Sequence, residues 1–226
     1  MLIPFVRSDL ERNDRFSFSC NRCKLCCRAK KIQVNPYEIA RIAGNLGIST
    51  TDCIRKYTVE NGSYLKFDEN DTCLFLGPEG CAIHRDRPLV CRLYPLARHV
   101  NDRDIEWFSE MERERECRGV CGTAATIEEY LDEQDTCNYI QTANRYLKVL
   151  WEMMHVLDES RASENNPDEP DENGAMENQP DENTVWTDMD AAVKKYCMET
   201  RSAVPSSIEE KMRMHLDALL LWTKPS

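Results

Sequence analysis

The sequence FSCNRCKLCC at residues 18–27 gives the N-terminal half of this chain its chemical character, because it places four cysteines within eight positions. Two successive C-x2-C steps allow the sulfurs of Cys20, Cys23 and Cys26 to converge on one centre, while backbone amides in the turns point toward the thiolates. Adjacent side chains in a compact turn or helix diverge by about 100°, so Cys26 and Cys27 are not expected to bind the same ion. The run therefore predicts two neighbouring metal sites, or one site plus a spare thiol.

The chain has twelve cysteines, and those downstream of the run can complete such sites. Cys73, Cys81 and Cys91 follow at irregular spacing, and Cys117 and Cys121 add two more candidates. Two tetrathiolate sites need eight thiolates. We therefore expect the metal ligands to be Cys20, Cys23, Cys26, Cys27, Cys73, Cys81, Cys91 and Cys117.

Other cysteines fit a packing role better than a ligand role. Cys53, Cys137 and Cys197 stand alone within helical patterns, and an isolated free cysteine commonly behaves as a small buried hydrophobe. We expect these three side chains in the core. His84, three positions after Cys81, is either an imidazole ligand of a mixed site or a ring packed near the cysteines.

Most of the net charge of −11 comes from residues 159–184, which alone carry −8. This stretch contains Pro167, Pro170 and Pro180 and almost no bulky apolar residue, a composition that cannot offset the entropy lost on ordering. We interpret it as a solvated, disordered linker, and an acidic docking tail is the alternative. Elsewhere acidic and basic residues are interleaved without an aromatic-basic stripe, so nucleic acid is not an expected partner.

The N-terminal residues indicate the compartment. Residues 1–6 form only a short apolar run, which Arg7 and Asp9 follow at once, so the sequence shows no secretory signal. No apolar run approaches the roughly 20 residues that cross a bilayer. We therefore expect a cytoplasmic protein without a membrane span, whose reduced cysteines bind metal instead of forming disulfides.

Local signals place the cysteines among short elements. Asn35 as N-cap, Pro36 in the first turn and Gly47 as a stop predict a helix directly behind the cysteine run. The patterns of residues 73–83 and 97–108 are typical of β-hairpins. The cysteine-rich half should therefore be rich in loops.

From Thr126 onward the pattern becomes helical. Thr126 and Glu129 form a capping box that opens a long amphipathic helix, and Ser207 with Glu210 caps a later helix. The predicted fold class is mainly α, with a loop-rich, metal-stabilised cysteine-cluster domain, short β-hairpins and a C-terminal helical bundle. The predicted divisions are a cysteine-cluster metal-binding domain at 1–125, a long amphipathic helix at 126–158, an acidic disordered linker at 159–184 and C-terminal helices at 185–226.

The ordered motifs resemble the YkgJ-like cysteine-cluster family, whose signature is CxxCxxCC. The resemblance rests on FxCxxCxxCC at residues 18–27, CxFL at 73–76 and GCxIHxxRPxxCRxYP at 80–95, and it covers about half of the chain. It implies a zinc- or iron-chelating domain, and some relatives that methylate lysine in flagellin carry a similar cluster. The family often ends its cluster in a Cys-Pro-Gly turn. Because this chain has CRGVCG at residues 117–122 instead, either Cys117 or Cys121 can be the last ligand.

Thiolate-only ligation suits iron and zinc alike. The C-x2-C-x2-C run has the spacing of the first three cluster ligands of bacterial ferredoxins, so we expect an iron-sulfur cluster of the [4Fe-4S] type, with zinc as the alternative. The predicted protein acts in electron transfer or in the assembly or modification of a partner protein, which it contacts through the C-terminal helices. The alternatives are a structural zinc-binding interaction module and a component of a methyltransferase-like, protein-modifying enzyme. No recognisable catalytic motif decides whether the chain is an enzyme.

Overall fold

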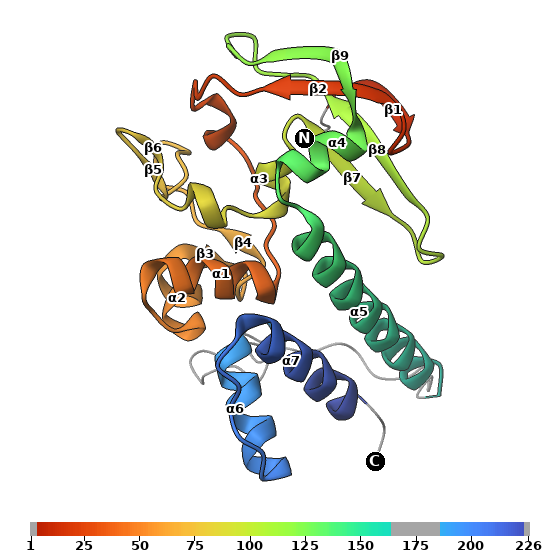
Figure 1. Ribbon diagram of the computed structural model, residues 1–226. Coiled ribbons are helices and arrows are strands. Elements are labelled where there is room, and N and C mark those ends of the chain that lie inside the picture. The colour runs from red at the N-terminus through yellow and green to blue at the C-terminus, as the bar shows by residue number, and fades with distance from the viewer. Residues whose placement is uncertain (1–3, 164–185, 224–226) are drawn as a thin grey trace, which may run out of the picture.

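The computed structural model describes residues 4–163 and 186–223, and its elements mix helices with antiparallel strands (Figure 1). The predicted helices are present, but the fold is mixed rather than mainly α, because residues 5–19 and 96–126 contribute several strands. The sequence of β9 (Val120–Thr126), VCGTAAT, has no alternation of apolar and polar residues, so it carries no period-two signal. Within the described residues, no helix has the length and apolar character needed to cross a membrane.

A three-stranded antiparallel sheet lies at one end of the molecule (Figure 1). It consists of β1 (Phe5–Leu10), β8 (Glu106–Met111) and β7 (Leu96–Val100), in the order β1-β8-β7. β7 and β8 form the hairpin that the sequence predicts, with Arg98 opposite Phe108. Phe108 is fully buried on the inner face of this sheet.

A second sheet pairs β2 (Arg15–Ser19) with β9. Its register sets Phe18 opposite Cys121. Just beyond the sheet, the side-chain amide of Asn21 donates to the carbonyl oxygen of Arg118 at 2.6 Å. Because β2 leads directly into the cysteine run, this pairing holds the run against a loop about one hundred positions later in the sequence.

The helix behind the cysteine run is α1 (Pro36–Leu46), and its ends are those that the capping residues predict. Asn35 accepts from the N–H of Glu38, the Glu38 carboxylate accepts from the N–H of Asn35, and Gly47 ends the helix at φ 66°. The elements that follow it are α2 (Thr50–Tyr57), β3 (Thr58–Val59), β4 (Tyr64–Leu65), β5 (Leu76–Gly77), β6 (Gly80–Cys81) and α3 (Leu89–Leu93). The hairpin predicted within residues 73–83 is therefore confirmed as β5–β6.

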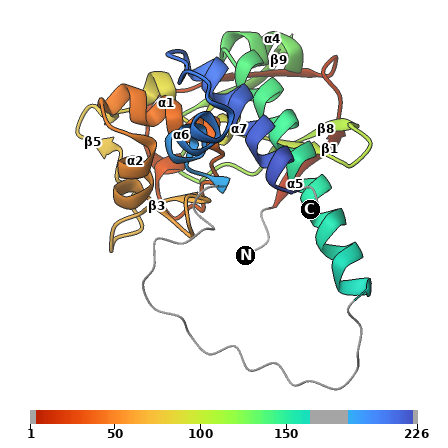
Figure 2. The same ribbon diagram turned by 90° about the horizontal axis from the view of Figure 1, so that it is seen from below.

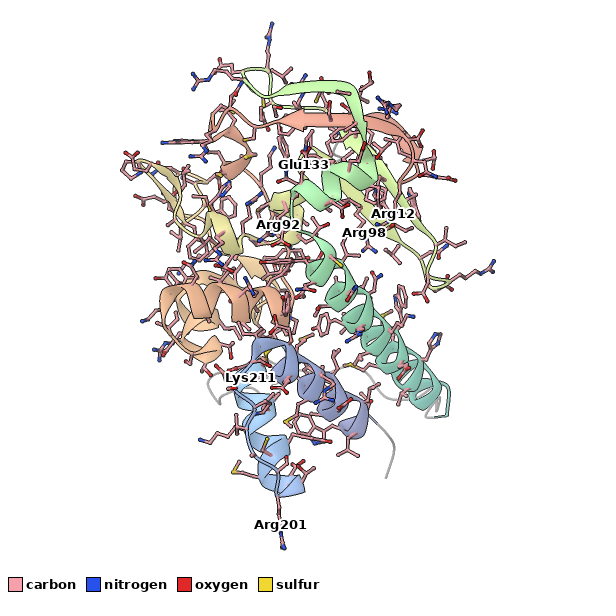
Figure 3. All side chains as sticks on the ribbon, viewed as in Figure 1. Arg12, Arg92, Arg98, Glu133, Arg201 and Lys211 are labelled. Carbon is pink, nitrogen blue, oxygen red and sulfur yellow. The ribbon has the colours of Figure 1, made fainter. Side chains whose placement is uncertain are left out.

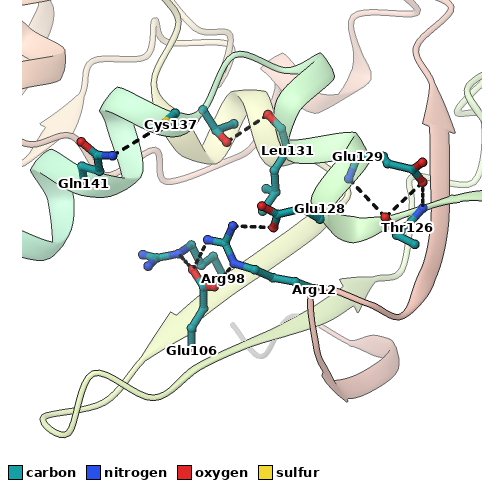
Figure 4. Close-up of polar contacts among 10 residues, drawn as sticks. Arg12, Arg98, Glu106, Thr126, Glu128, Glu129, Leu131, Cys137 and Gln141 are labelled. Carbon is teal, nitrogen blue, oxygen red and sulfur yellow. Dashed lines mark hydrogen bonds and ion pairs between the residues drawn. The ribbon is translucent and has the colours of Figure 1, made fainter.

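The helix expected over residues 126–158 is two helices, α4 (Ile127–Glu133) and α5 (Cys137–Ser163). The predicted capping box of Thr126 and Glu129 opens α4 (Figure 4). The break follows because Asp135 adopts a left-handed backbone at φ 52° and the Thr136 hydroxyl donates to the carbonyl of Leu131. α5 also extends beyond position 159, where we expected the linker to begin, and residues 164–185 of that linker lie outside the described residues.

Ionic contacts tie α4 to the sheets (Figure 4). The Arg12 guanidinium binds Glu106 of β8 and Glu128 of α4, each at 2.5 Å. Arg98 of β7 binds the same Glu106 and also donates to Asn144 of α5 at 2.8 Å. The two arginines therefore fix the start of the helical half against the strands.

The predicted C-terminal helices are present as α6 (Met189–Thr200) and α7 (Ile208–Trp222), and they pack against α1, α2 and α5 (Figure 2). Asp188, the N-cap of α6, accepts from the hydroxyls of Thr50 and Thr51 at 2.6 Å each. Both helices contribute to the same apolar core as β2, α1 and α4. The boundary between a cysteine-cluster domain and a separate helical part stays a prediction.

Candidate metal centre

The cysteine run folds into a tight knuckle between β2 and α1. Arg22 and Lys24 adopt left-handed backbone conformations, at φ 50° and 68°, that reverse the chain direction. A 3-10 turn, η1 (Leu25–Cys27), follows, and the N–H of Cys27 donates to the carbonyl of Lys24 at 3.2 Å. The sulfur contacts of Cys23 and Cys26 place the cysteines of the run in two neighbouring groups.

An outer group forms where the β2–β9 sheet ends, and its members are Cys20, Cys23, Cys117 and Cys121. The sulfurs of Cys23 and Cys117 lie 3.9 Å apart. Cys121 is paired with Phe18 in the sheet, and Cys20 directly follows β2 and is exposed. Cys117 and Cys121 pack against the core that holds Phe18, so this group belongs to the strand half of the molecule.

An inner group lies between the knuckle, the β5–β6 hairpin and α3, and its members are Cys26, Cys27, Cys73, Cys81 and Cys91. The N–H of Cys73 donates to the carbonyl of Cys27 at 3.0 Å, which fixes the two chain segments side by side. Cys73 and Cys81 pack against a second apolar core, which includes Ile39 and Phe75. Thiols near the knuckle therefore pack against two different apolar cores: Cys117 and Cys121 against the core with Phe18, and Cys73 and Cys81 against the core with Ile39.

The expectation that Cys26 and Cys27 diverge is wrong, because their sulfurs are only 4.0 Å apart. The 100° rotation per residue that we assumed applies to a regular α-helix, whereas these residues lie in a short 3-10 turn whose side-chain rotamers bring the sulfurs together. One ion can therefore contact both sulfurs without any change in backbone path.

The two close sulfur pairs have the spacing of ligands that share an ion. In a tetrahedral site with metal–sulfur distances of about 2.3 Å, ligand sulfurs lie about 3.8 Å apart. The pairs Cys23–Cys117 and Cys26–Cys27 each match one edge of such a tetrahedron. Across residues 4–163 and 186–223, however, no three side chains of Cys, His, Asp or Glu already converge as a set that could hold a metal. The described arrangement is thus two open groups of free thiols.

The thiols differ in how readily they lose a proton. A hydrogen bond from Cys27 lowers the pKa of Cys26 to about 7, and it raises the pKa of Cys27. Burial raises the pKa of Cys91, and nearby thiolate charge on Cys73, Cys26 and Cys81 would raise it further. Metal binding by the inner group must therefore displace protons, so its affinity depends on pH.

All eight expected ligands lie in these two groups, and Cys121 joins them as a ninth thiol. Whether each one binds metal stays a prediction. His84 is exposed, and its carbonyl oxygen accepts from Arg87 at 2.6 Å. Cys53 and Cys197 are buried as expected, but Cys137 is exposed, so the prediction of a core position is wrong for Cys137. Cys137 is the first residue of α5. The helical sequence pattern runs on from α4 to α5, but the helix itself is interrupted between them.

Sequence reasoning did not identify the polar residues that hold α3 and Cys91 in place. Glu38 is buried, and its carboxylate accepts from the N–H of Leu89 at 2.6 Å. This bond gives the first N–H of α3 an acceptor. Arg92, labelled in Figure 3, is buried between α3 and the α4–α5 break, where it donates to the carbonyl of Gln134 at 2.7 Å. The only sequence signal was the dense RPLVCRLYP segment at residues 87–95.

Comparison with known proteins identifies the family of the cysteine-rich part of the chain. The family profile named CxxCxxCC, described as "Putative zinc- or iron-chelating domain", matches residues 19–138 and so contains both cysteine groups. The chain belongs to the CxxCxxCC family. The uncharacterized protein MJ0661 of Methanocaldococcus jannaschii is 30% identical over 119 residues, which cover 50% of this chain and 64% of that relative. No solved structure matches the chain.

Proposed function

We propose that this CxxCxxCC protein holds an iron-sulfur cluster on its inner cysteine group and acts in electron transfer or in the assembly or modification of a partner protein. The observation that carries the proposal is a group of five thiols from separate chain segments beside a small apolar core, near enough to one another that thiolate charge on one raises the pKa of others. Such a donor set fits an iron-sulfur cluster, which cysteine thiolates normally bind. When bound, the cluster would supply a centre that accepts and releases single electrons.

The chain's own residues would hold the ligands and limit access of water. Cys73, Cys81 and Cys91 are only partly exposed, and the buried side chains of Phe75 and Ile83 belong to the same small core against which Cys73 and Cys81 pack. Burial and hydrogen bonding set the reduction potential of such centres. The partly closed position therefore supports a redox role more than a role in open metal storage.

Zinc is the second candidate, and a specific observation favours it. The sulfur separations of 3.9 Å and 4.0 Å match the edge of a single-ion tetrahedron, whereas each cysteine of a [4Fe-4S] cluster binds a different iron. On this alternative the cysteine groups would be structural sites, and the protein would be an interaction module.

For the partner, we propose contact through the C-terminal helices. Met198 of α6 and Leu221 of α7 are large apolar side chains with 66% and 49% exposure. Their exposure near the C-terminal ends of α6 and α7 supports a protein surface as the partner. The free state of all twelve thiols is compatible with the reducing cytoplasm that we expect.

Three single variants, compared with the wild type, test the ligand groups. Metal per chain is measured after identical anaerobic reconstitution of Cys91→Ser, Cys117→Ser and the control Cys137→Ser. We expect Cys91→Ser to lose the inner centre, Cys117→Ser to lose only the outer one, and Cys137→Ser to keep full metal content. Equal metal loss in all three variants, or none in Cys91→Ser, would contradict the proposal.

A further inference from the structure

The hydroxyl of Tyr94 is a buried polar group without a hydrogen-bond partner among the described residues. A phenol hydroxyl both donates and accepts, and leaving one unpaired in the interior costs free energy. Tyr94 lies three residues after Cys91, directly behind α3. Its unpaired oxygen is therefore at the edge of the cysteine groups rather than in a remote part of the core.

The position of Tyr94 is fixed by contacts that do not involve its hydroxyl. The hydroxyl of Tyr130 donates to the backbone carbonyl of Tyr94 at 2.8 Å, which holds the main chain. The ring packs edge-to-face against Phe18, with centroids 6.0 Å apart and planes at 80°. Phe18 in turn is the strand partner of Cys121. The ring therefore cannot swing toward solvent to satisfy its hydroxyl without losing this packing.

The groups that act on the hydroxyl include two cysteines and Glu114. Cys117 and Cys26 are both close enough that their charge as thiolates would raise the pKa of the phenol. The N–H of Glu114 faces the phenol oxygen but falls short of hydrogen-bond geometry, and such a contact would in any case use the oxygen as acceptor. The hydrogen of the hydroxyl has no acceptor among the described residues. The Glu114 carboxylate is already paired with Lys30, which leaves the cysteine sulfurs as the nearby acceptors that metal binding would convert to thiolates.

We propose that the Tyr94 hydroxyl donates a hydrogen bond to a metal-bound cysteine sulfur, that of Cys117, and so links the outer group to α3 of the inner group. The inference rests on the outer metal centre that the proposed function expects beside the inner one, but it does not depend on whether the metal is iron or zinc. Tyr94 is thus a positioning residue that completes its own hydrogen bonding only when metal is bound. A metal-bound cysteine is a thiolate, and a thiolate accepts a hydrogen bond more strongly than the thiol of a metal-free site does.

This proposal predicts effects of opposite sign in the two states of the protein. Tyr94→Phe removes the unpaired hydroxyl but keeps the ring that packs on Phe18. The metal-free variant should therefore unfold at the same or a higher denaturant concentration than the metal-free wild type. The metal-loaded variant should release metal to a chelator about tenfold faster, because a hydrogen bond to a charged acceptor is lost.

The matched control is Tyr146→Phe. Tyr146 is another largely buried phenol, its hydroxyl donates to the carbonyl of Trp186 at 3.4 Å, and it lies on α5, which carries no member of the two cysteine groups. Both variants and the wild type are purified without oxygen as full chains, and three quantities are measured: metal content, release rate to a chelator, and denaturant midpoint with and without metal. Only Tyr94→Phe should change the release rate.

The outcomes separate this inference from the proposed function. A wild-type release rate in Tyr94→Phe, or a lower metal-free midpoint than that of the wild type, overturns the role of Tyr94 and leaves the iron-sulfur proposal intact. Wild-type protein that contains zinc and no iron overturns the iron-sulfur proposal, and faster zinc release from Tyr94→Phe still supports the hydrogen bond. A wild-type chain that binds no metal under any condition overturns both.

Discussion

Replacing Arg92 with methionine should destabilise the protein more than any surface arginine substitution. The Arg92 side chain is almost completely buried, with 4% of the residue exposed. It donates to the carbonyl of Arg87 at 3.1 Å, to that of Gln134 at 2.7 Å, and to that of Arg85. Its guanidinium also contacts Tyr139, as hydrogen-bond donor at 3.0 Å and as a cation 4.2 Å from the ring centroid.

The expected magnitude follows from the acceptors that remain. Each of three carbonyls would lose a donor, and an unsatisfied buried acceptor costs about 1–3 kcal/mol, so the upper bound is about 9 kcal/mol. Methionine keeps most of the apolar stem, and water or local relaxation can satisfy part of the loss. We therefore expect a decrease of about 4 kcal/mol in the free energy of unfolding, a large share of the 5–15 kcal/mol typical of a folded protein.

Urea unfolding of metal-free Arg92→Met measures this decrease, and metal content after anaerobic reconstitution measures its effect on Cys91. The control is Arg55→Met, because Arg55 is a surface residue with a 71% exposed side chain that pairs with Asp52 of the same helix. That variant should lose less than about 1 kcal/mol. If the two variants lost similar free energy, or if Arg92→Met retained wild-type metal affinity, the assigned role of Arg92 would be refuted.

Two further substitutions test the supports of each cysteine group. Gly119→Ala would place a Cβ 2.4 Å from the Phe18 ring, so it should cost about 1–3 kcal/mol in a urea melt, unlike the control Gly77→Ala, whose nearest neighbour is at 3.6 Å. Burial raises the pKa of Glu38 to about 7 in the folded protein, so its stabilising effect is complete below pH 4.5 and is lost as the pH rises through 7. The unfolding free energy of the wild type relative to Glu38→Gln should therefore fall by about 3 kcal/mol over that range, and parallel pH curves would contradict this.

The sequence was sufficient to predict those helix ends that are determined by residues within the helix or next to it. The ends of α1 follow from Asn35, Pro36 and Gly47, and the start of α4 follows from Thr126, because these residues act within one helical turn. The strand β9 could not be predicted, since its conformation comes from pairing with β2 rather than from its small, exposed side chains. The break at Gln134 was hidden for a similar reason, because Arg92 from another element binds the carbonyl there.

For the candidate site, too, the sequence predicted one part and not another. The sequence singled out the cysteines of the run Cys20 to Cys27 as ligand candidates, since such a run has no packing rationale. It did not divide them between an outer and an inner group, because that division depends on two left-handed residues in the knuckle and on the contact between Cys23 and Cys117. The hydroxyl of Tyr94 had no sequence signal at all.

Iron and acid-labile sulfide, measured in wild-type protein purified without oxygen, test the central claim most directly. We predict comparable amounts of iron and sulfide, together with broad visible absorbance that bleaches on reduction. Colourless protein that contains stoichiometric zinc, and that takes up neither iron nor sulfide on reconstitution, would contradict the iron-sulfur proposal and with it electron transfer.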